Sequence, residues 1–169
     1  MWNAPRMDQP LVALDPMTVD ELDAYRRWAS DNLAAQLVLA RGVSLEEATR
    51  AAQRQLDAVL PEGRPRPEHT FALSVRTGDR SIGSILCGWQ ADLGQRRFYL
   101  YDLVIAPAHR GQHLGRAAMR ALAQRAAEMG ATAIALNVFG HNGVARALYE
   151  SLGYKTEHVG MVLAVGSSA

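Results

Sequence analysis

The chain lacks the features that mark several protein classes. It has a single cysteine, Cys87, in 169 residues, so no disulfide forms within the chain and a reducing compartment is the natural setting. No stretch approaches the roughly 20 apolar residues of a membrane span, and the first ten residues contain no apolar signal-peptide core. The formal net charge is +1, whereas dedicated nucleic-acid binders carry a clear basic excess. We therefore expect a cytoplasmic protein that binds neither nucleic acid nor membrane.

The composition that remains is typical of one folded domain. The chain is 49% hydrophobic and 21% charged, and its length suits a single core. Thr18 and Ser44 each begin a capping box, because a glutamate stands three residues later. Apolar residues then recur at three- and four-residue spacing, which predicts helices from Thr18 to Arg41 and from Ser44 to Val59. A short strand over Leu11–Leu14 precedes them.

From Thr70 onward the apolar period changes from helical spacing to the two-residue spacing of strands. The first predicted element is a three-stranded antiparallel meander at 70–76, 81–90 and 97–105. A helix at 111–129, a strand at 133–138, a second helix at 144–152 and a closing strand pair at 154–165 follow. The strand before Pro107 is expected beside the strand from Ala133. The sequence therefore predicts a mixed α/β (α+β) domain spanning residues 1–169.

The junction between the third meander strand and the next helix has the composition of an anion site. A helix start presents unpaired backbone N–H groups and the positive end of the helix dipole. Gly111 and Gly115 leave room for a phosphate, and Arg110 and Arg116 supply charge. The alternative is that the glycines serve only a tight turn and the arginines are solvated. The segment is neither a Walker A loop nor a dinucleotide fingerprint, since the spacing of both is absent.

This junction resembles the acetyl-CoA motif of the GCN5-related N-acetyltransferases, Q/R-x-x-G-x-G/A. The order from Arg110 to Gly115 matches it, except that His113 stands where the first motif glycine is usual. Histidine tolerates positive φ better than most residues, so we expect the turn to keep its shape. A second segment resembles the C-terminal motif of the family, N-x-x-A-x-x-L-Y-E-x-L-G-F/Y, with matches at Asn142, Ala145, Leu148, Tyr149, Glu150, Leu152, Gly153 and Tyr154.

The resemblance implies a fold and an activity. The fold is GNAT-like, with a central, mostly antiparallel sheet that splays between the strand before Pro107 and the strand from Ala133 and is flanked by helices. The activity is acetyl-CoA-dependent N-acetyl transfer, with residues 70–165 as the acetyl-CoA core and the helices at 18–60 as the variable acceptor side. Acetyl-CoA is then a co-substrate and no metal is involved. The acceptor is a small-molecule amine or a protein amino group, and the resemblance also allows a homodimer.

The resemblance also implies which residues bind acetyl-CoA. The turn and helix start hold the pyrophosphate and the strand backbone pairs with the pantetheine, which gives as binding residues Leu103, Val104, Ile105, Arg110, Gly111, Gln112, His113, Leu114, Gly115 and Arg116. Tyr149 would protonate the departing sulfur, a phenol being acidic enough for that transfer; the alternative is a core tyrosine. Asn142 binds the pantetheine, caps the last helix, or does both.

The general base stays open at this stage. Relatives that modify protein N-termini often carry a glutamate where this chain has Asn137, and an amide cannot accept the proton. The favoured candidates are Asp102 and His141, and the amine proton could also leave through a chain of waters to either of them or to Tyr99 or Tyr101. His141 is at least as well explained as a loop residue open to solvent. Strand alternation predicts that Tyr99 and Tyr101 share a face with Leu103, while Asp102 points to the other side.

Two further chemistries are disfavoured. His109 and His113 are four residues apart but have no third ligand or helical H-E-x-x-H pattern beside them, so zinc is not expected. Cys87 stands in an apolar strand with no neighbouring base, which favours direct transfer over an acyl-cysteine.

The alternative function, from another class, is a sensor that binds CoA or acetyl-CoA without efficient catalysis.

Overall fold

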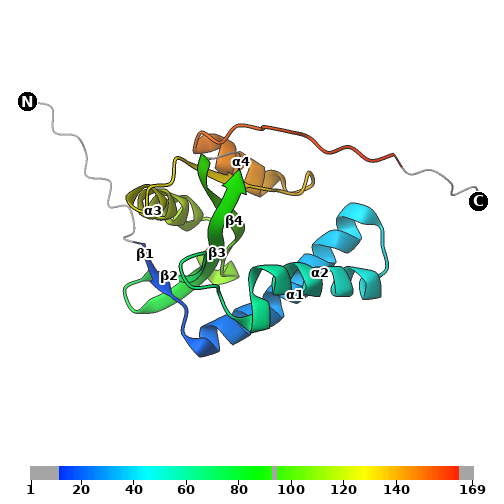
Figure 1. Ribbon diagram of the computed structural model, residues 1–169, viewed down its shortest axis with the longest axis horizontal. Coiled ribbons are helices and arrows are strands. Elements are labelled where there is room, and N and C mark those ends of the chain that lie inside the picture. The colour runs from blue at the N-terminus through cyan, green and yellow to red at the C-terminus, as the bar shows by residue number, and fades with distance from the viewer. Residues whose placement is uncertain (1–11, 93–94, 164–169) are drawn as a thin grey trace, which may run out of the picture.

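A computed structural model of the protein describes residues 12–92 and 95–163, and Figure 1 shows its elements along the chain. One five-stranded sheet has the order β1-β2-β3-β4-β5. The strands are Ala13–Pro16, Thr70–Thr77, Arg80–Asp92, Gln95–Ile105 and Ala133–Leu136. Neighbouring strands are antiparallel except β4 and β5, which are parallel. The meander and the pairing of the strand before Pro107 with the strand from Ala133 are confirmed.

Helices α1 and α2 begin where the capping boxes at Thr18 and Ser44 predict. Their bounds are α1 Val19–Arg41, α2 Leu45–Val59, α3 Leu114–Glu128 and α4 Gly143–Ser151, with short 3-10 helices η1 at Pro61–Gly63 and η2 at Pro107–His109. Thr18 Oγ1 accepts from the Glu21 N–H at 3.2 Å, and Ser44 Oγ accepts from the Glu47 N–H at 3.2 Å. Both capping boxes are therefore formed. No helix within the described residues is long and apolar enough to cross a membrane.

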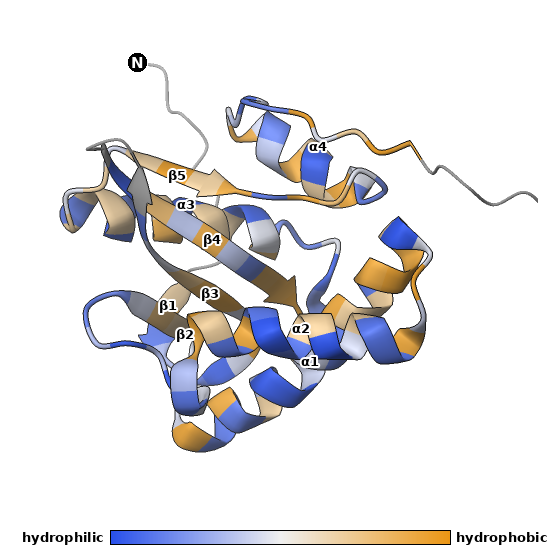
Figure 2. Ribbon diagram, turned by 45° about the vertical axis from the view of Figure 1, so that its right-hand side comes forward, coloured by the Kyte–Doolittle hydropathy of each residue, from blue (hydrophilic) through white to orange (hydrophobic). Residues whose placement is uncertain are grey.

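Helices cover both faces of the sheet (Figures 1 and 2). On one face, α1 and α2 pack against the sheet through a cluster that contains Leu22, Tyr25, Ala72 and Leu86. On the other face, α3 packs through a larger cluster that contains Leu73, Ile85, Phe98, Leu100 and Leu122. Ala72 and Leu73 are neighbours on β2 and face opposite clusters, which is the structural cause of the two-residue period.

The sheet opens between its last two strands. β5 pairs only with residues 97–100 of β4. The remainder of β4, residues 101–105, has β3 on one side and no strand on the other among the described residues. β4 and β5 therefore separate after residue 100, as the resemblance predicts, and leave a free backbone edge at 101–105. This edge lies directly before the glycine-containing turn.

A β-bulge lies at the point where the sheet opens. Leu86 pairs with Asp102 and Cys87 pairs with Leu100, so Tyr101 has no partner on β3. A bulge adds one residue to one strand and shifts the alternation of side chains beyond it by one. The faces on which residues 101–105 lie therefore cannot be obtained by counting from residues 97–100.

The bulge makes one expectation wrong. Leu103 and Ile105 pack against the same cluster as Phe98 and Leu100, on the α3 side. Tyr99 does not share a face with Leu103, since Phe98 and Leu100 flank it on the α3 side, and its ring lies 5.0 Å from that of Tyr101. The sequence alternation assumed a regular strand, which the extra residue interrupts.

Several element boundaries also differ from the sequence prediction; for example, β5 ends at Leu136, not at residue 138. Helix α3 begins at Leu114, not at residue 111, because His113 has a positive φ of 59° that a helix does not admit. The first strand runs through Pro16, and Leu11 lies outside the described residues. The closing strand pair is wrong for residues 154–163, which form no strand; residues 164–165 lie outside the described part. An alternating segment becomes a strand only beside another strand, and this one has none.

Candidate active site

The turn between β4 and α3 presents a row of backbone donors. The Arg110 N–H donates to Pro107 O at 3.3 Å, and the next backbone bond of this segment runs from the Ala117 N–H to His113 O at 3.1 Å. The N–H groups of residues 111–116 between them have no backbone acceptor among the described residues. Such a row at the positive end of a helix fits a pyrophosphate.

Backbone conformation shapes this turn. Gly111 has φ 75° and His113 has φ 59°, both in the left-handed region. The turn therefore keeps its shape with histidine at the position of the usual glycine, as expected. A Cβ built on Gly111 would have no heavy atom within 4 Å, so the space above this residue is open to a ligand.

The polar side chains that flank the turn form hydrogen bonds within the protein. Arg110 Nε donates to Ile105 O at 3.0 Å, and Gln112 Nε2 lies 3.5 Å from Ala108 O. Arg116 donates to Ser151 Oγ at 2.8 Å and to Ser151 O at 3.4 Å. Arg116 thereby joins the start of α3 to the end of α4. These bonds give both arginines a structural role, and their contact with phosphate stays a prediction.

The strand before the turn is positioned by β3 and α4. Leu103, Val104 and Ile105 pair with Ile85, Ser84 and Gly83 on one edge. At the start of α3, a Cβ on Gly115 would lie 3.5 Å from Leu148 and 3.8 Å from Ile105. Gly115 therefore stands where α3, α4 and the end of β4 meet. Leu114 is buried beside it and anchors the helix start in the core.

Asp102 lies immediately after the bulge and faces α1. The Tyr25 hydroxyl donates to Asp102 Oδ2 at 3.0 Å. Burial raises the pKa of Asp102 to about 6, although the hydrogen bonds from Tyr25 and from the Leu103 backbone act in the opposite direction. Asp102 is thus a carboxylate at neutral pH whose affinity for a proton exceeds that of an ordinary aspartate.

Tyr149 lies on α4, partly buried against the main cluster. Burial raises the pKa of Tyr149 to about 12, and the negative charge of Asp102 adds to the shift. The charge of Asp102 on β4 thus acts on the Tyr149 hydroxyl, although β4 and α4 are far apart in the sequence. Tyr149 therefore keeps its proton at neutral pH. Its ring also lies 5.6 Å from that of Tyr154.

Asn142 caps helix α4. Its Oδ1 accepts from the Ala145 N–H at 3.1 Å, so the capping alternative is confirmed. His141 precedes it and is exposed; its Nε2 lies 2.6 Å from Gln36 Oε1 on α1, and its ring stacks on Phe139 at 5.4 Å. His141 thus links the loop after β5 to helix α1.

The partners on α1 were not found from the sequence. Tyr25 and Gln36 lie on a helix whose pattern shows only an apolar stripe, and a tyrosine on that stripe is indistinguishable from an ordinary core residue. Only the bulge on β4 turns Asp102 toward Tyr25. Within the sequence, the one available signal is that a buried tyrosine hydroxyl needs a polar partner.

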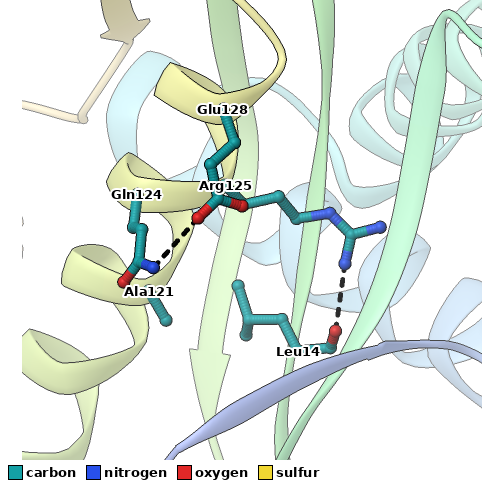
Figure 3. Close-up of a pocket in the computed structure, with 5 residues that line it drawn as sticks. All are labelled: Leu14, Ala121, Gln124, Arg125 and Glu128. Atoms are coloured by element: carbon teal, nitrogen blue, oxygen red, sulfur yellow. Dashed lines mark hydrogen bonds between the residues drawn. The ribbon is translucent and has the colours of Figure 1, made fainter.

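The hollow of Figure 3 lies elsewhere, between β1 and the C-terminal half of α3. Arg125 donates to Leu14 O at 3.0 Å, and Gln124 donates to Glu128 at 3.0 Å. The polar groups of this hollow are thus bonded within the protein. The hollow lies at the opposite end of α3 from the turn at 111–116. This hollow is therefore separate from the candidate site.

The comparisons with known proteins agree with this geometry. A sequence model of the acetyltransferase (GNAT) family matches residues 23–154. The chain belongs to this family. It is therefore an N-acetyltransferase, and the family implies acetyl-CoA as donor and an acceptor substrate.

Relatives in Bacillus subtilis (strain 168) cover almost the whole domain. The uncharacterized N-acetyltransferase YdgE is 28% identical over 148 residues, which are 88% of this chain and 94% of that protein. The uncharacterized N-acetyltransferase YycN is 28% identical over 155 residues, 89% of this chain and 96% of that protein. The crystal structure of YycN superposes with a TM-score of 0.86 at 26% identity, covering 93% of this chain and all of that one. The mixed α/β GNAT-like fold is thereby confirmed.

Proposed function

We propose that this N-acetyltransferase moves the acetyl group directly from the thioester of acetyl-CoA to a primary amine. Acetyl-CoA supplies the activated acyl group. The N–H groups of residues 111–116 would hold its pyrophosphate, and the free backbone edge of Leu103, Val104 and Ile105 would hold its pantetheine. Both features fit, because the donors lack backbone acceptors and the edge lacks a strand among the described residues.

Asp102 is the proposed general base. An amine attacks only as the neutral species, so the site must accept a proton during the reaction. A carboxylate whose pKa burial has raised to about 6 is ionised at neutral pH and holds a proton better than an ordinary aspartate. We prefer it to His141, because His141 is exposed and its Nε2 is already bonded to Gln36. A strand N–H next to Asp102 would donate to the thioester oxygen as negative charge develops there.

Tyr149 is the proposed general acid. The leaving thiolate needs a proton, and a phenol with a pKa of about 12 is fully protonated at neutral pH. Breaking the carbon–sulfur bond places the electron pair on sulfur, which then takes the Tyr149 proton. The proton that Asp102 received from the amine then returns through solvent to the Tyr149 phenolate, which restores both groups. No enzyme nucleophile is required, consistent with the fully buried Cys87.

The row of unpaired donors at residues 111–116, placed at the end of an open strand edge, carries the proposal. Its test is acetyl-CoA titration by calorimetry, followed by thiol detection of CoA release with amines added one at a time. We expect binding together with amine-dependent release. Absence of binding at millimolar acetyl-CoA would refute the proposal. Binding without release for every amine would favour the sensor alternative.

The amine panel should separate the acceptor classes. Asp102 is a half-buried carboxylate that faces α1, and a polycation would require several carboxylates. We therefore propose acceptors with one reacting amino group, either small monoamines or the amino group of a peptide. Tyr149→Phe is the companion variant: acetyl-CoA binding should persist while turnover falls about 100-fold or more, the usual size of a lost proton donor. Full turnover in that variant would remove the general-acid role alone.

A further inference from the structure

Tyr25 stands out because the reaction proposed above gives it no role. Its side chain is 7% exposed, and its hydroxyl donates to Asp102 Oδ2 at 3.0 Å across a sequence separation of 77 residues. The bond joins the N-terminal helix to the bulge of β4. It is therefore a contact between the acceptor-side helices and the residue proposed to receive the proton.

The position of the Tyr25 hydroxyl is fixed by packing. Tyr25 lies in the cluster that holds α1 to the sheet, together with Leu22, Ala29 and Leu86. A tyrosine ring has only two side-chain torsions, so a packed helix places its hydroxyl firmly. Asp102 pairs with Leu86 directly after the bulge of β4. The packed tyrosine therefore presents a fixed donor toward which the Asp102 carboxylate is oriented.

We propose that Tyr25 is a positioning residue for acetyl transfer: its hydroxyl holds the Asp102 carboxylate in the orientation that receives the proton of the acceptor amine. The inference rests on the proposed function, because it presumes that Asp102 is the base. The amine nitrogen forms the new bond to the acetyl carbon, its proton passes to Asp102, and the sulfur leaves with the proton of Tyr149. Tyr25 keeps its own proton throughout.

The groups around Asp102 are consistent with this role. The Leu103 backbone N–H also bonds to the carboxylate. The negative charge of Asp102 raises the pKa of Tyr149 on α4. The Cys87 thiol of β3 adds a small electrostatic contribution to the raised pKa of Tyr25. Burial raises the pKa of both tyrosines and of the thiol, so all three are neutral when Asp102 is charged. The Tyr25 hydroxyl and the Leu103 N–H are the donors to the carboxylate in this set.

The test is Tyr25→Phe, with Leu22→Val as its matched control from the same helix and cluster. Removing a donor to the carboxylate raises the pKa of Asp102, so the acidic limb of kcat/KM should move to higher pH in Tyr25→Phe. At neutral pH kcat should fall about 10-fold, the usual loss for a hydrogen bond to a charged group. The Kd for acetyl-CoA should not change. Leu22→Val should lower stability and leave the pH profile in place.

Three outcomes decide the matter. A Tyr25→Phe profile that coincides with wild type, while Asp102→Asn is inactive, overturns the role of Tyr25 and leaves the base in place. Full activity of Asp102→Asn at every pH overturns the base and, with it, the role of Tyr25. If Tyr25→Phe folds poorly, site-specific 3-fluorotyrosine at position 25 keeps the ring and strengthens the donor; the acidic limb must then move to lower pH, and an unchanged limb refutes the proposal.

Discussion

Replacing Asp102 by asparagine is expected to abolish turnover and to stabilise the protein at alkaline pH. The Tyr25 hydroxyl can donate to an amide oxygen as it does to Asp102 Oδ2, so the local hydrogen bond survives. The charge is lost, and with it the free-energy cost of holding an ionised carboxyl away from water. A catalytic group that destabilises the fold is a common feature of active sites.

The size of the effect follows from the pKa of Asp102, which burial raises from its ordinary value of 3.8 to about 6. A carboxyl that binds its proton more tightly when folded contributes less stability as pH rises through that interval. Between pH 5 and pH 8 the wild-type protein should lose about 1.4 kcal/mol through this group, with an upper bound of about 3 kcal/mol over the whole titration. Asparagine does not titrate, so its variant loses none of this.

The assay is urea unfolding of both proteins at several pH values from 5 to 8. Tyr25 and Tyr149, whose pKa values the charge of Asp102 raises, stay protonated throughout this range, so the difference in free energy of unfolding isolates residue 102. We expect the advantage of Asp102→Asn to grow by about 1.4 kcal/mol across that range. A difference that stays constant with pH would mean that the folded carboxylate is as well hydrated as the unfolded one, and the burial argument would be refuted. Thiol-release assays on the same samples should show a loss of about 100-fold or more.

Other positions offer independent checks. Asn142→Ala should cost about 1 kcal/mol of stability by thermal unfolding, since it removes the cap on the Ala145 N–H, and Asn142→Ser should restore it; an unchanged Tm in the alanine variant would contradict the cap. His113→Gly should retain acetyl-CoA affinity in calorimetry, whereas His113→Val should lose it, because a branched residue resists a φ of 59°. The Cys87 thiol is fully buried and its pKa is raised to about 12, so native protein should resist iodoacetamide, and rapid labelling seen by mass spectrometry would show that β3 opens.

Local chemistry explains why much of the fold was predictable. The capping boxes at Thr18 and Ser44 specify helix starts through bonds within four residues. Positive φ at Gly42 and Gly130 marks the ends of α1 and α3 in the same way. The acetyl-CoA turn is also local, because its donors are consecutive backbone N–H groups. Patterns of this kind are present in the sequence itself and require no knowledge of distant segments.

The acceptor side depends on distant segments. The bulge at Tyr101 exists only in the pairing of β3 with β4, and no pattern in either strand marks it. Tyr25 meets Asp102 across 77 positions, and Gln36 meets His141 across 105. Each contact requires α1 to be packed on the sheet before the polar groups come together.

By itself, the sequence determined the starts of α1 and α2, the strands of the meander, the donor-rich turn at residues 111–116 and the family to which the chain belongs. Tertiary structure decided which way Asp102 faces, what holds it, and that the alternating segment after Tyr154 forms no strand. The physical reason is that a turn or a cap is completed by neighbouring residues. The orientation of a strand side chain after a bulge, and the pairing of an edge, are completed only by another part of the chain.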